Sequence, residues 1–306
     1  DTLSGLNAVS TFNLQPAIGE YISTNALTFT SFEALLGGSE TDTFAINGIV
    51  AFNLNGNAGD DILHFNDGAA LAGAFDGGSG MDTLNFQGNA SGRTVALTGL
   101  GSKDGFAGKA PGGTFNNVDR LIGGNATSDA LTGLDAPANW MLDNGISYYI
   151  STNALAFSDI ELLTGGADAD TCAFGDGAAL SGTLNGAGGV NVLNYSAYSS
   201  GVNVDLDLGT ATGTVGIANI TNLIGGQAND LLTGDADANT ITGGPGDDTL
   251  FGGGGDDRYL FGNGSGWDTV HENASGGWDV LDFSGVASPL TFSVHTYTVV
   301  DTDTRV

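Results

Sequence analysis

Aspartates recur at fixed spacing inside glycine-rich turns, and they are the residues of this sequence best suited to chemistry. Adjacent carboxylates occur at Asp60-Asp61, Asp247-Asp248 and Asp256-Asp257. Paired carboxylates can act as general acid and base, or they can bind a metal ion. Because the pairs recur in turn after turn, a single active site does not account for them, and repeated metal binding does.

The turns between residues 225 and 260 keep a nine-residue register. Each of four units opens with glycine, has Asp or Asn at its sixth place and carries a large apolar residue at its eighth. The glycines permit tight turns, and three residues of strand follow with the middle side chain directed inward. A flexible Gly/Asp-rich linker is the alternative, but a linker does not keep Leu232, Ile241, Leu250 and Tyr259 nine residues apart.

Two such units are expected to form one flattened coil, so that alternate units stack. Asp230 then falls above Asp248, and Asn239 above Asp257. Two bare carboxylates about 4.8 Å apart repel by about 1 kcal/mol in water and by several times more inside a protein. A stacked row of aspartates therefore requires a cation.

Carboxylates and turn carbonyls together make an all-oxygen ligand set, which suits several Ca²⁺ ions better than Mg²⁺, zinc or copper. The face with Asp230 and Asp248 is expected to bind better than the face with Asn239. The predicted metal ligands of this region are Asp230, Asn239, Gly243, Asp247, Asp248, Gly252, Asp256, Asp257 and Asp268.

Imperfect turns of the same kind occur earlier in the chain. They begin at positions 37, 56 and 77, and again at 165 and 186, so that successive starts are separated by slightly more than two nonapeptides. Asp42, Asp61 and Asp82 should form a ladder, and Asp170 with Asn191 a poorer one. The alternative is that glycine and Asx hydrogen bonds bend these turns without metal.

The elements that hold these turns show period-two alternation, as at residues 202–208, and long amphipathic helical patterns are absent. The segment at 21–27 returns unchanged at 149–155. We therefore predict related sub-repeats at 1–128 and 129–224, a regular region at 225–270 and the start of a further repeat at 271–306. Residues 99–118, which include Lys103 and Lys109, interrupt the pattern and are expected to form a protruding loop.

The nonapeptide run resembles the repeats-in-toxin (RTX, haemolysin-type) calcium-binding family. The resemblance implies a β-roll that folds outside the cell when calcium rises. The resulting prediction is one continuous all-β domain over residues 1–306, a right-handed parallel β-solenoid of roughly fifteen coils. The family occurs in secreted bacterial toxins, proteases, lipases, surface-layer proteins and giant adhesins, which implies a secreted or cell-surface location.

Composition agrees with an acidic exported protein. The chain of 306 residues has 35 acids against 6 lysines and arginines, a formal net charge of −29. That charge argues against nucleic acid or an anionic membrane as partner, and no apolar run is long enough to insert into a membrane. Cys172, the single cysteine, permits no internal disulfide and is expected to face the core. The chain begins in mid-repeat, which predicts flanking repeats or further copies stacked end to end.

The function predicted from these features is structural: a calcium-stabilised extracellular rod, as a segment of a surface protein, adhesin or fibre. A self-assembling filament or surface-layer subunit, or the non-catalytic carrier region of a secreted hydrolase, are the alternatives. A solenoid enzyme acting on polysaccharide is disfavoured, because His64, His271 and His295 are far apart in sequence and no catalytic motif occurs. We expect no enzymatic activity.

Overall fold

The computed structural model describes residues 1–273 and 276–287. These residues form β-strands joined by turns, with no α-helix among them, as the period-two pattern predicts. No helix in this part of the chain could span a membrane. The strands fall into two compact units, residues 1–191 with 213–219 (unit 1) and residues 192–212 with the described part of 220–306 (unit 2).

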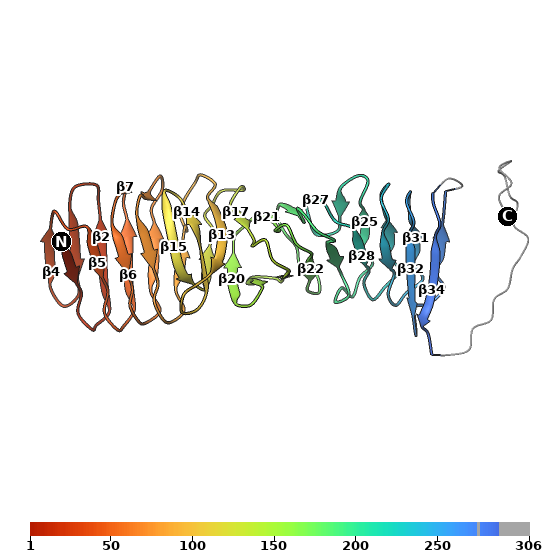
Figure 1. The fold of residues 1–306 in the computed structure, drawn as a ribbon, viewed down its shortest axis with the longest axis horizontal. Coiled ribbons are helices and arrows are strands. Elements are labelled where there is room, and N and C mark those ends of the chain that lie inside the picture. Colours follow the sequence, from red (N-terminus) through yellow and green to blue (C-terminus); the bar gives the residue numbers. More distant parts are fainter. Residues whose placement is uncertain (274–275, 288–306) are drawn as a thin grey trace, which may run out of the picture. The chain divides into compact units, whose positions relative to one another are not determined.

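The strands of unit 1 lie in two long sheets, in which the parallel neighbours come from separate parts of the sequence (Figure 1). A short pair, β7 (Ile49–Val50) and β10 (Ala70–Leu71), lies beside them. The first sheet has the order β1 (Thr2–Ser4), β5 (Ala34–Leu36), β8 (Asn53–Asn55), β11 (Ala74–Asp76), β15 (Gly113–Val118), β14 (Phe106–Ala110), β13 (Thr94–Leu100), β17 (Ala130–Thr132), β21 (Leu162–Thr164), β23 (Thr183–Asn185) and β27 (Gly216–Ala218). The second has the order β4 (Ala26–Phe29), β3 (Gly19–Ile22), β2 (Ser10–Leu14), β6 (Asp42–Ile46), β9 (Ile62–Phe65), β12 (Thr83–Asn85), β16 (Arg120–Ile122), β20 (Ala154–Ser158), β19 (Ser147–Ile150), β18 (Ala138–Leu142) and β22 (Asp170–Phe174).

Unit 2 holds the regular nonapeptides on two faces. One face has the order β24 (Val192–Asn194), β28 (Asn222–Ile224), β30 (Thr240–Thr242), β32 (Arg258–Gly262) and β34 (Val280–Gly285). The other has the order β26 (Thr210–Ala211), β25 (Asn203–Asp205), β29 (Leu231–Thr233), β31 (Thr249–Phe251) and β33 (Thr269–His271). Parallel pairing sets Leu232 against Leu250 and Ile241 against Tyr259, so alternate units stack as predicted.

The core follows the alternation of the strands. The four apolar residues at the eighth places of the nonapeptides, Leu232, Ile241, Leu250 and Tyr259, are fully buried. Cys172 on β22 is 3% exposed, which confirms that it faces the core. Burial raises the pKa of its thiol far above the usual range, so it is an inert core side chain.

The sheets are not parallel throughout, which differs from the predicted solenoid. Strands β2, β3 and β4 form an antiparallel meander, and β18, β19 and β20 form the same meander in the second copy of the internal repeat. The prediction of a protruding loop at residues 99–118 was wrong. That stretch contributes to a third meander, formed by β13, β14 and β15, and lies within the first sheet of unit 1. Alternating side chains suit parallel and antiparallel strands equally, so the pattern did not reveal these reversals.

Three structural predictions remain predictions: one continuous domain, its right-handed winding and the sub-repeat boundaries. The sub-repeat predicted at 271–306 is described only through residue 287 and without residues 274–275.

Candidate metal centres

The sixth-place side chains stack coil upon coil, as the sequence predicts. In unit 2 the backbone N–H of Asp230 donates to Asp248 Oδ1 at 2.8 Å, and that of Asn239 donates to Asp257 Oδ1 at 2.8 Å. In unit 1 the N–H of Asp42 donates to Asp61 Oδ1 at 2.7 Å. One carboxylate oxygen of each ladder residue thus bonds the coil before it, which leaves the other oxygen to be satisfied within its own turn.

Ladder residues are buried even though they are acidic. Asp42, Asp61 and Asp82 have no exposed surface, and Asp248 and Asp257 are 1% exposed. A buried carboxylate requires a hydrogen-bond donor or a cation, because an isolated ionised group is strongly disfavoured away from water.

In one class of turns, the second residue supplies that donor. Gly38 N–H donates to Asp42 Oδ2 at 2.6 Å, and Gly166 N–H donates to Asp170 Oδ2 at 3.1 Å. Gly226 N–H caps Asp230 in the same way. In the turn with Asn239, the Asp235 N–H donates to the side-chain oxygen of Asn239 at 2.9 Å. We call these four turns capped turns: 37–42, 165–170, 225–230 and 234–239.

In a second class, the open turns, the Oδ2 atom has no partner. The buried atoms Asp61 Oδ2, Asp82 Oδ2, Asp248 Oδ2 and Asp257 Oδ2 accept no hydrogen bond in the described part of the chain. The second residue of each of these turns has a positive φ: Asn57 (70°), Gly78 (104°), Gly244 (106°) and Gly253 (101°). The open turns with an aspartate are 56–61, 77–82, 243–248 and 252–257.

The residue at the fourth place separates the two classes. The open turns have glycine there with a positive φ, as at Gly59 (109°) and Gly246 (138°). Capped turns have Glu40, Asp168, Ala228 or Asp237 at that place. A side chain disfavours the left-handed conformation, so its turn closes onto its own carboxylate.

The turn at 186–191 is open but carries Asn191 in place of aspartate. Ala187 (φ 61°) and Gly189 (φ 79°) are in the left-handed region, as in the other open turns. Asn191 Nδ2 donates to the carbonyl oxygens of Gly188 and Asn219, both at 2.9 Å. This amide group shows that backbone carbonyls point at the side chain of an open turn. With aspartate in place of asparagine, only oxygens would converge there.

Electrostatics single out the same carboxylates. Burial, with a smaller contribution from neighbouring aspartates, raises the pKa of Asp61 and of Asp82 from 3.8 to about 7. Burial likewise raises the pKa of Asp248 to about 6. Without a cation, ionising these buried carboxylates costs free energy. A hard divalent ion, which prefers oxygen ligands, would offset that cost by binding the charged form. The donor set of the open turns therefore fits Ca²⁺.

The remaining predicted ligands lie around these carboxylates. Asp268 Oδ1 accepts from the Asp248 N–H at 3.0 Å and extends the ladder. Asp247 and Asp256 are exposed, and their Oδ1 atoms accept the N–H groups of Trp267 and Trp278 from the following coil. The carbonyl oxygens of Gly243 and Gly252 lie over Gly225 and Gly234, next to Asp230 Oδ2 and Asn239 Oδ1.

The sequence did not reveal every member of the ladders. Asp119 accepts the Asp82 N–H at 3.1 Å, and Glu161 accepts the Asp129 N–H at 3.0 Å. Asp129 itself accepts the Gly124 N–H at 2.7 Å. Compared with the capped turns, the turn at 123–129 holds one extra residue, which removed Asp129 from the expected sixth place.

The family comparison agrees with the geometry. The model of the RTX calcium-binding nonapeptide repeat matches the chain in four copies, over residues 53–70 and 224–259. The two matched segments are RTX-type repeats. RTX repeats imply calcium binding, form a non-catalytic repeat domain and occur in secreted bacterial proteins. The first matched segment contains the open turn of Asp61, and the second contains those of Asp248 and Asp257. Among curated proteins, no match was found.

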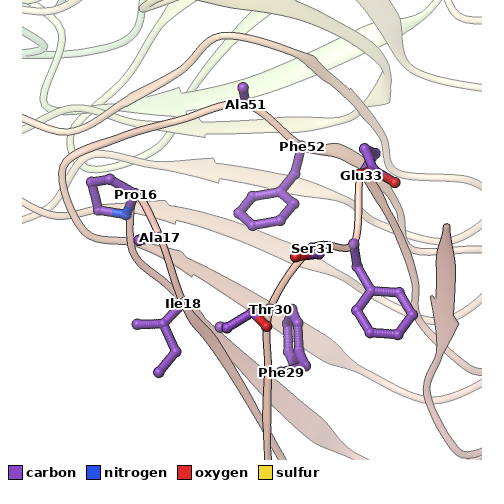
Figure 2. A pocket seen from close by; sticks show the side chains of 11 residues that line it. Pro16, Ala17, Ile18, Phe29, Thr30, Ser31, Glu33, Ala51 and Phe52 are labelled. Atoms are coloured by element: carbon purple, nitrogen blue, oxygen red, sulfur yellow. The ribbon is translucent and has the colours of Figure 1, made fainter.

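An open pocket of about 260 Å³ lies in unit 1, lined by Pro16, Ile18, Phe29, Phe52 and neighbouring residues (Figure 2). Glu33 is the only ionisable side chain in its lining, and it pairs with the terminal amine of Asp1. The His271 ring stacks on that of Phe251 with 4.6 Å between the ring centroids. His295 lies outside the described residues.

Proposed function

We propose that this chain is a calcium-stabilised extracellular structural rod, a segment of a secreted bacterial surface protein, adhesin or fibre, with no catalytic role of its own. The observation that carries the proposal is the set of buried, unpartnered Oδ2 atoms in the open turns. Each such atom destabilises the fold until a cation binds it. Folding and calcium binding are therefore coupled.

The open turns at Asp61, Asp82, Asp248 and Asp257 are the calcium sites of this proposal. The side chains of Asp42, Asp170, Asp230 and Asn239 in the capped turns accept backbone N–H groups of their own turns and need no ion. With free calcium at ten times the dissociation constant, each site adds about 1.4 kcal/mol. Several ions together can decide whether the chain folds.

Circular dichroism tests the proposal directly. In millimolar calcium the β-signal should be strong and the thermal transition cooperative, and excess chelator should lower the transition by many degrees or abolish the β-signal. Magnesium at the same concentration serves as the control and should not replace calcium. A spectrum and melting curve that chelator leaves unchanged would refute the coupling.

A second candidate, end-to-end stacking into a longer fibre, is favoured by two strand edges in unit 1. Strands β1 and β4 pair on one side only in the described structure, with β5 and β3. Their counterparts in the second copy of the internal repeat are covered, since β17 pairs with β13 and β20 with β16. Leu27 on β4 is 50% exposed, whereas its counterpart Leu155 is 1% exposed. The occupant we propose for these edges is a coil like that of residues 94–122.

The internal repeat supplies the test of this docking. Residues 93–128 would be fused ahead of residue 1 in a Leu27→Cys variant, whose introduced thiol is exposed while Cys172 is buried. The fusion should slow labelling of the introduced thiol at least tenfold. A matched fusion that carries Leu121→Asp should not. Equal labelling rates with and without the fused coil would contradict the docking.

A further inference from the structure

The turn that follows β33 departs from the nonapeptide pattern. Strand β31 pairs with β33 so that Phe251 lies opposite His271, and the next residues, Gly252 and Glu272, occupy equivalent places in stacked turns. Every unit between 225 and 260 begins with glycine at that place. Here a carboxylate side chain replaces the hydrogen of glycine.

The Glu272 carboxylate reaches back over the preceding turn. A Cβ added to Gly252 would lie within 2.7 Å of Asp257 Oδ2, Tyr259 Oη and Glu272 Oε1, so these three oxygens meet above one backbone position. The Tyr259 hydroxyl donates to Glu272 Oε1 and fixes that carboxylate. One oxygen each from Asp257, Glu272 and Asp279 lies within 4.8 Å of the other two.

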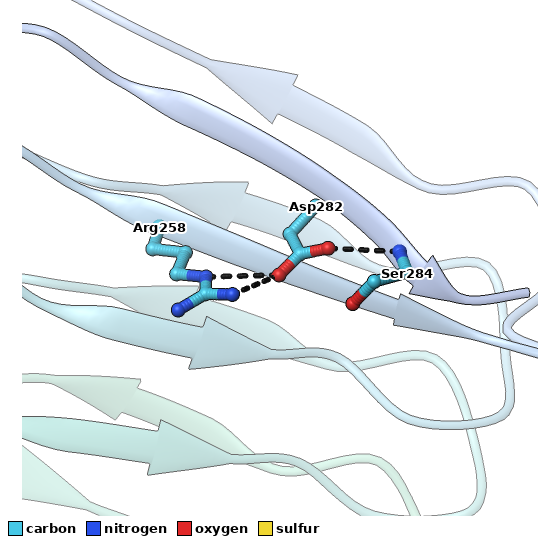
Figure 3. Close-up of polar contacts among 3 residues, drawn as sticks. All are labelled: Arg258, Asp282 and Ser284. Carbon is cyan, nitrogen blue, oxygen red and sulfur yellow. Dashed lines mark hydrogen bonds and ion pairs between the residues drawn. The ribbon is translucent and has the colours of Figure 1, made fainter.

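A separate observation indicates that a ligand is required there. Asp257 is 1% exposed, and its Oδ2 atom has no hydrogen-bond partner in the described structure. Its other oxygen accepts the Asn239 N–H, and its own N–H donates to Asp279 Oδ1 at 3.0 Å. The neighbouring guanidinium does not neutralise it, because Arg258 is bound to Asp282 on β34 (Figure 3).

We propose that Asp257, Glu272 and Asp279 form a three-carboxylate site for one hard divalent cation, Ca²⁺, which differs from the repeat turns in using Glu272. Three carboxylates carry more negative charge than the two that neighbouring repeat turns offer. Calcium affinity rises with the charge of the ligands. This site therefore binds calcium more tightly than the other open turns. The inference rests on the proposed calcium-dependent function.

Titration calorimetry of the whole chain tests the site. In the wild type, one calcium ion should bind more tightly than the others. Glu272→Gln keeps the side-chain shape and the acceptor for the Tyr259 hydroxyl, and it should abolish binding of that ion or lower its affinity at least tenfold. Glu20→Gln is the control, because Glu20 lies on β3, outside the turns, and its loss removes the same charge. That control should leave the tightest ion unchanged.

A second variant guards against misfolding. Asp279→Asn keeps the oxygen that accepts the Asp257 N–H and should lower the affinity for the same ion. The double variant with Glu272→Gln should lose no additional ion. Circular dichroism in saturating calcium checks that each variant folds. Wild-type number and affinity of ions in both folded variants would overturn the three-carboxylate site while leaving the proposed function intact. Absence of calcium binding by wild type would overturn the proposed function itself.

Discussion

Replacing Asp248 by asparagine should change stability in opposite directions with and without calcium. In chelator, Asp248→Asn removes a buried carboxylate whose Oδ2 atom has no partner. The new amide retains an oxygen for the Asp230 N–H. Its NH₂ group can donate to nearby carbonyls, as the Asn191 amide does in another open turn. The metal-free protein should therefore become more stable.

The magnitude follows from the pKa of Asp248. Burial raises that pKa from 3.8 to about 6, so the ionised group destabilises the fold by about 3 kcal/mol at pH 7.5. Part of this gain is lost to imperfect amide geometry, which leaves a stabilisation of about 1–3 kcal/mol. In saturating calcium the sign reverses, because the variant loses a charged ligand and the stabilisation that the ion supplies.

Urea unfolding at pH 7.5, with chelator and with millimolar calcium, measures both signs. Asp230→Asn is the matched control in the same ladder. Both oxygens of Asp230 accept backbone N–H groups, from Val202 and from Gly226, and asparagine can satisfy only one of them. This control should be destabilised by about 1–3 kcal/mol in both conditions.

The reasoning fails if Asp248→Asn is destabilised in chelator as much as in calcium. That result would mean that both carboxylate oxygens of Asp248 accept hydrogen bonds in the metal-free protein, as those of Asp230 do. It would remove the distinction between open and capped turns.

Three further predictions use the same distinction. The chelated protein should be most stable near pH 4 and lose stability as pH rises from there to about 7, since the pKa values of Asp61 and Asp82 are raised from 3.8 to about 7 and favour their protonated forms; unfolding curves across that range check this, and a flat profile contradicts it. Asn191→Asp should create one additional calcium site and make the turn depend on calcium, which calorimetric ion counting would reveal. Gly246→Ala should destabilise the protein by about 1–3 kcal/mol with or without calcium, because residue 246 has φ 138° and the new Cβ would lie 2.7 Å from the Ala228 backbone; a change within error would contradict the strain.

The nonapeptide register could be predicted from sequence because it rests on short-range periodicity. Apolar residues nine apart place one inward side chain per unit, and two units per coil follow once parallel stacking is assumed. The hydrogen bond from the Asp230 N–H to Asp248 Oδ1 is the direct structural consequence of that register. Wherever a turn had its usual length, the sequence also identified the Asp or Asn at its sixth place as a member of a ladder.

The antiparallel meanders could not be predicted in this way. The repeated segment at 21–27 and 149–155 was recognised, but alternation does not record strand direction. Lys103 and Lys109 suggested a protruding loop. The strands around them nevertheless lie within the sheet, because alternate residues such as Phe106 and Phe115 are buried. Strand reversal is decided by pairing between segments, which a single sequence does not display.

Glu272 was missed for a different reason. The match to the repeat pattern ends before it, and its turn is longer than the regular units, so spacing gave no reason to place it beside Asp257. Its position depends on the pairing of β31 with β33. A carboxylate at the place of an expected glycine was the only available signal.

The response to calcium is expected to be distributed unevenly along the chain because a carboxylate in these turns has two ways to be satisfied. A side chain at the fourth place, such as Ala228, closes the turn onto its own aspartate, and that coil then needs no ion for its sixth residue. Glycine at the same place, such as Gly246, opens the turn and leaves the carboxylate to a cation. Capped turns thus maintain local order at low calcium, whereas open turns such as that of Asp248 supply the calcium dependence.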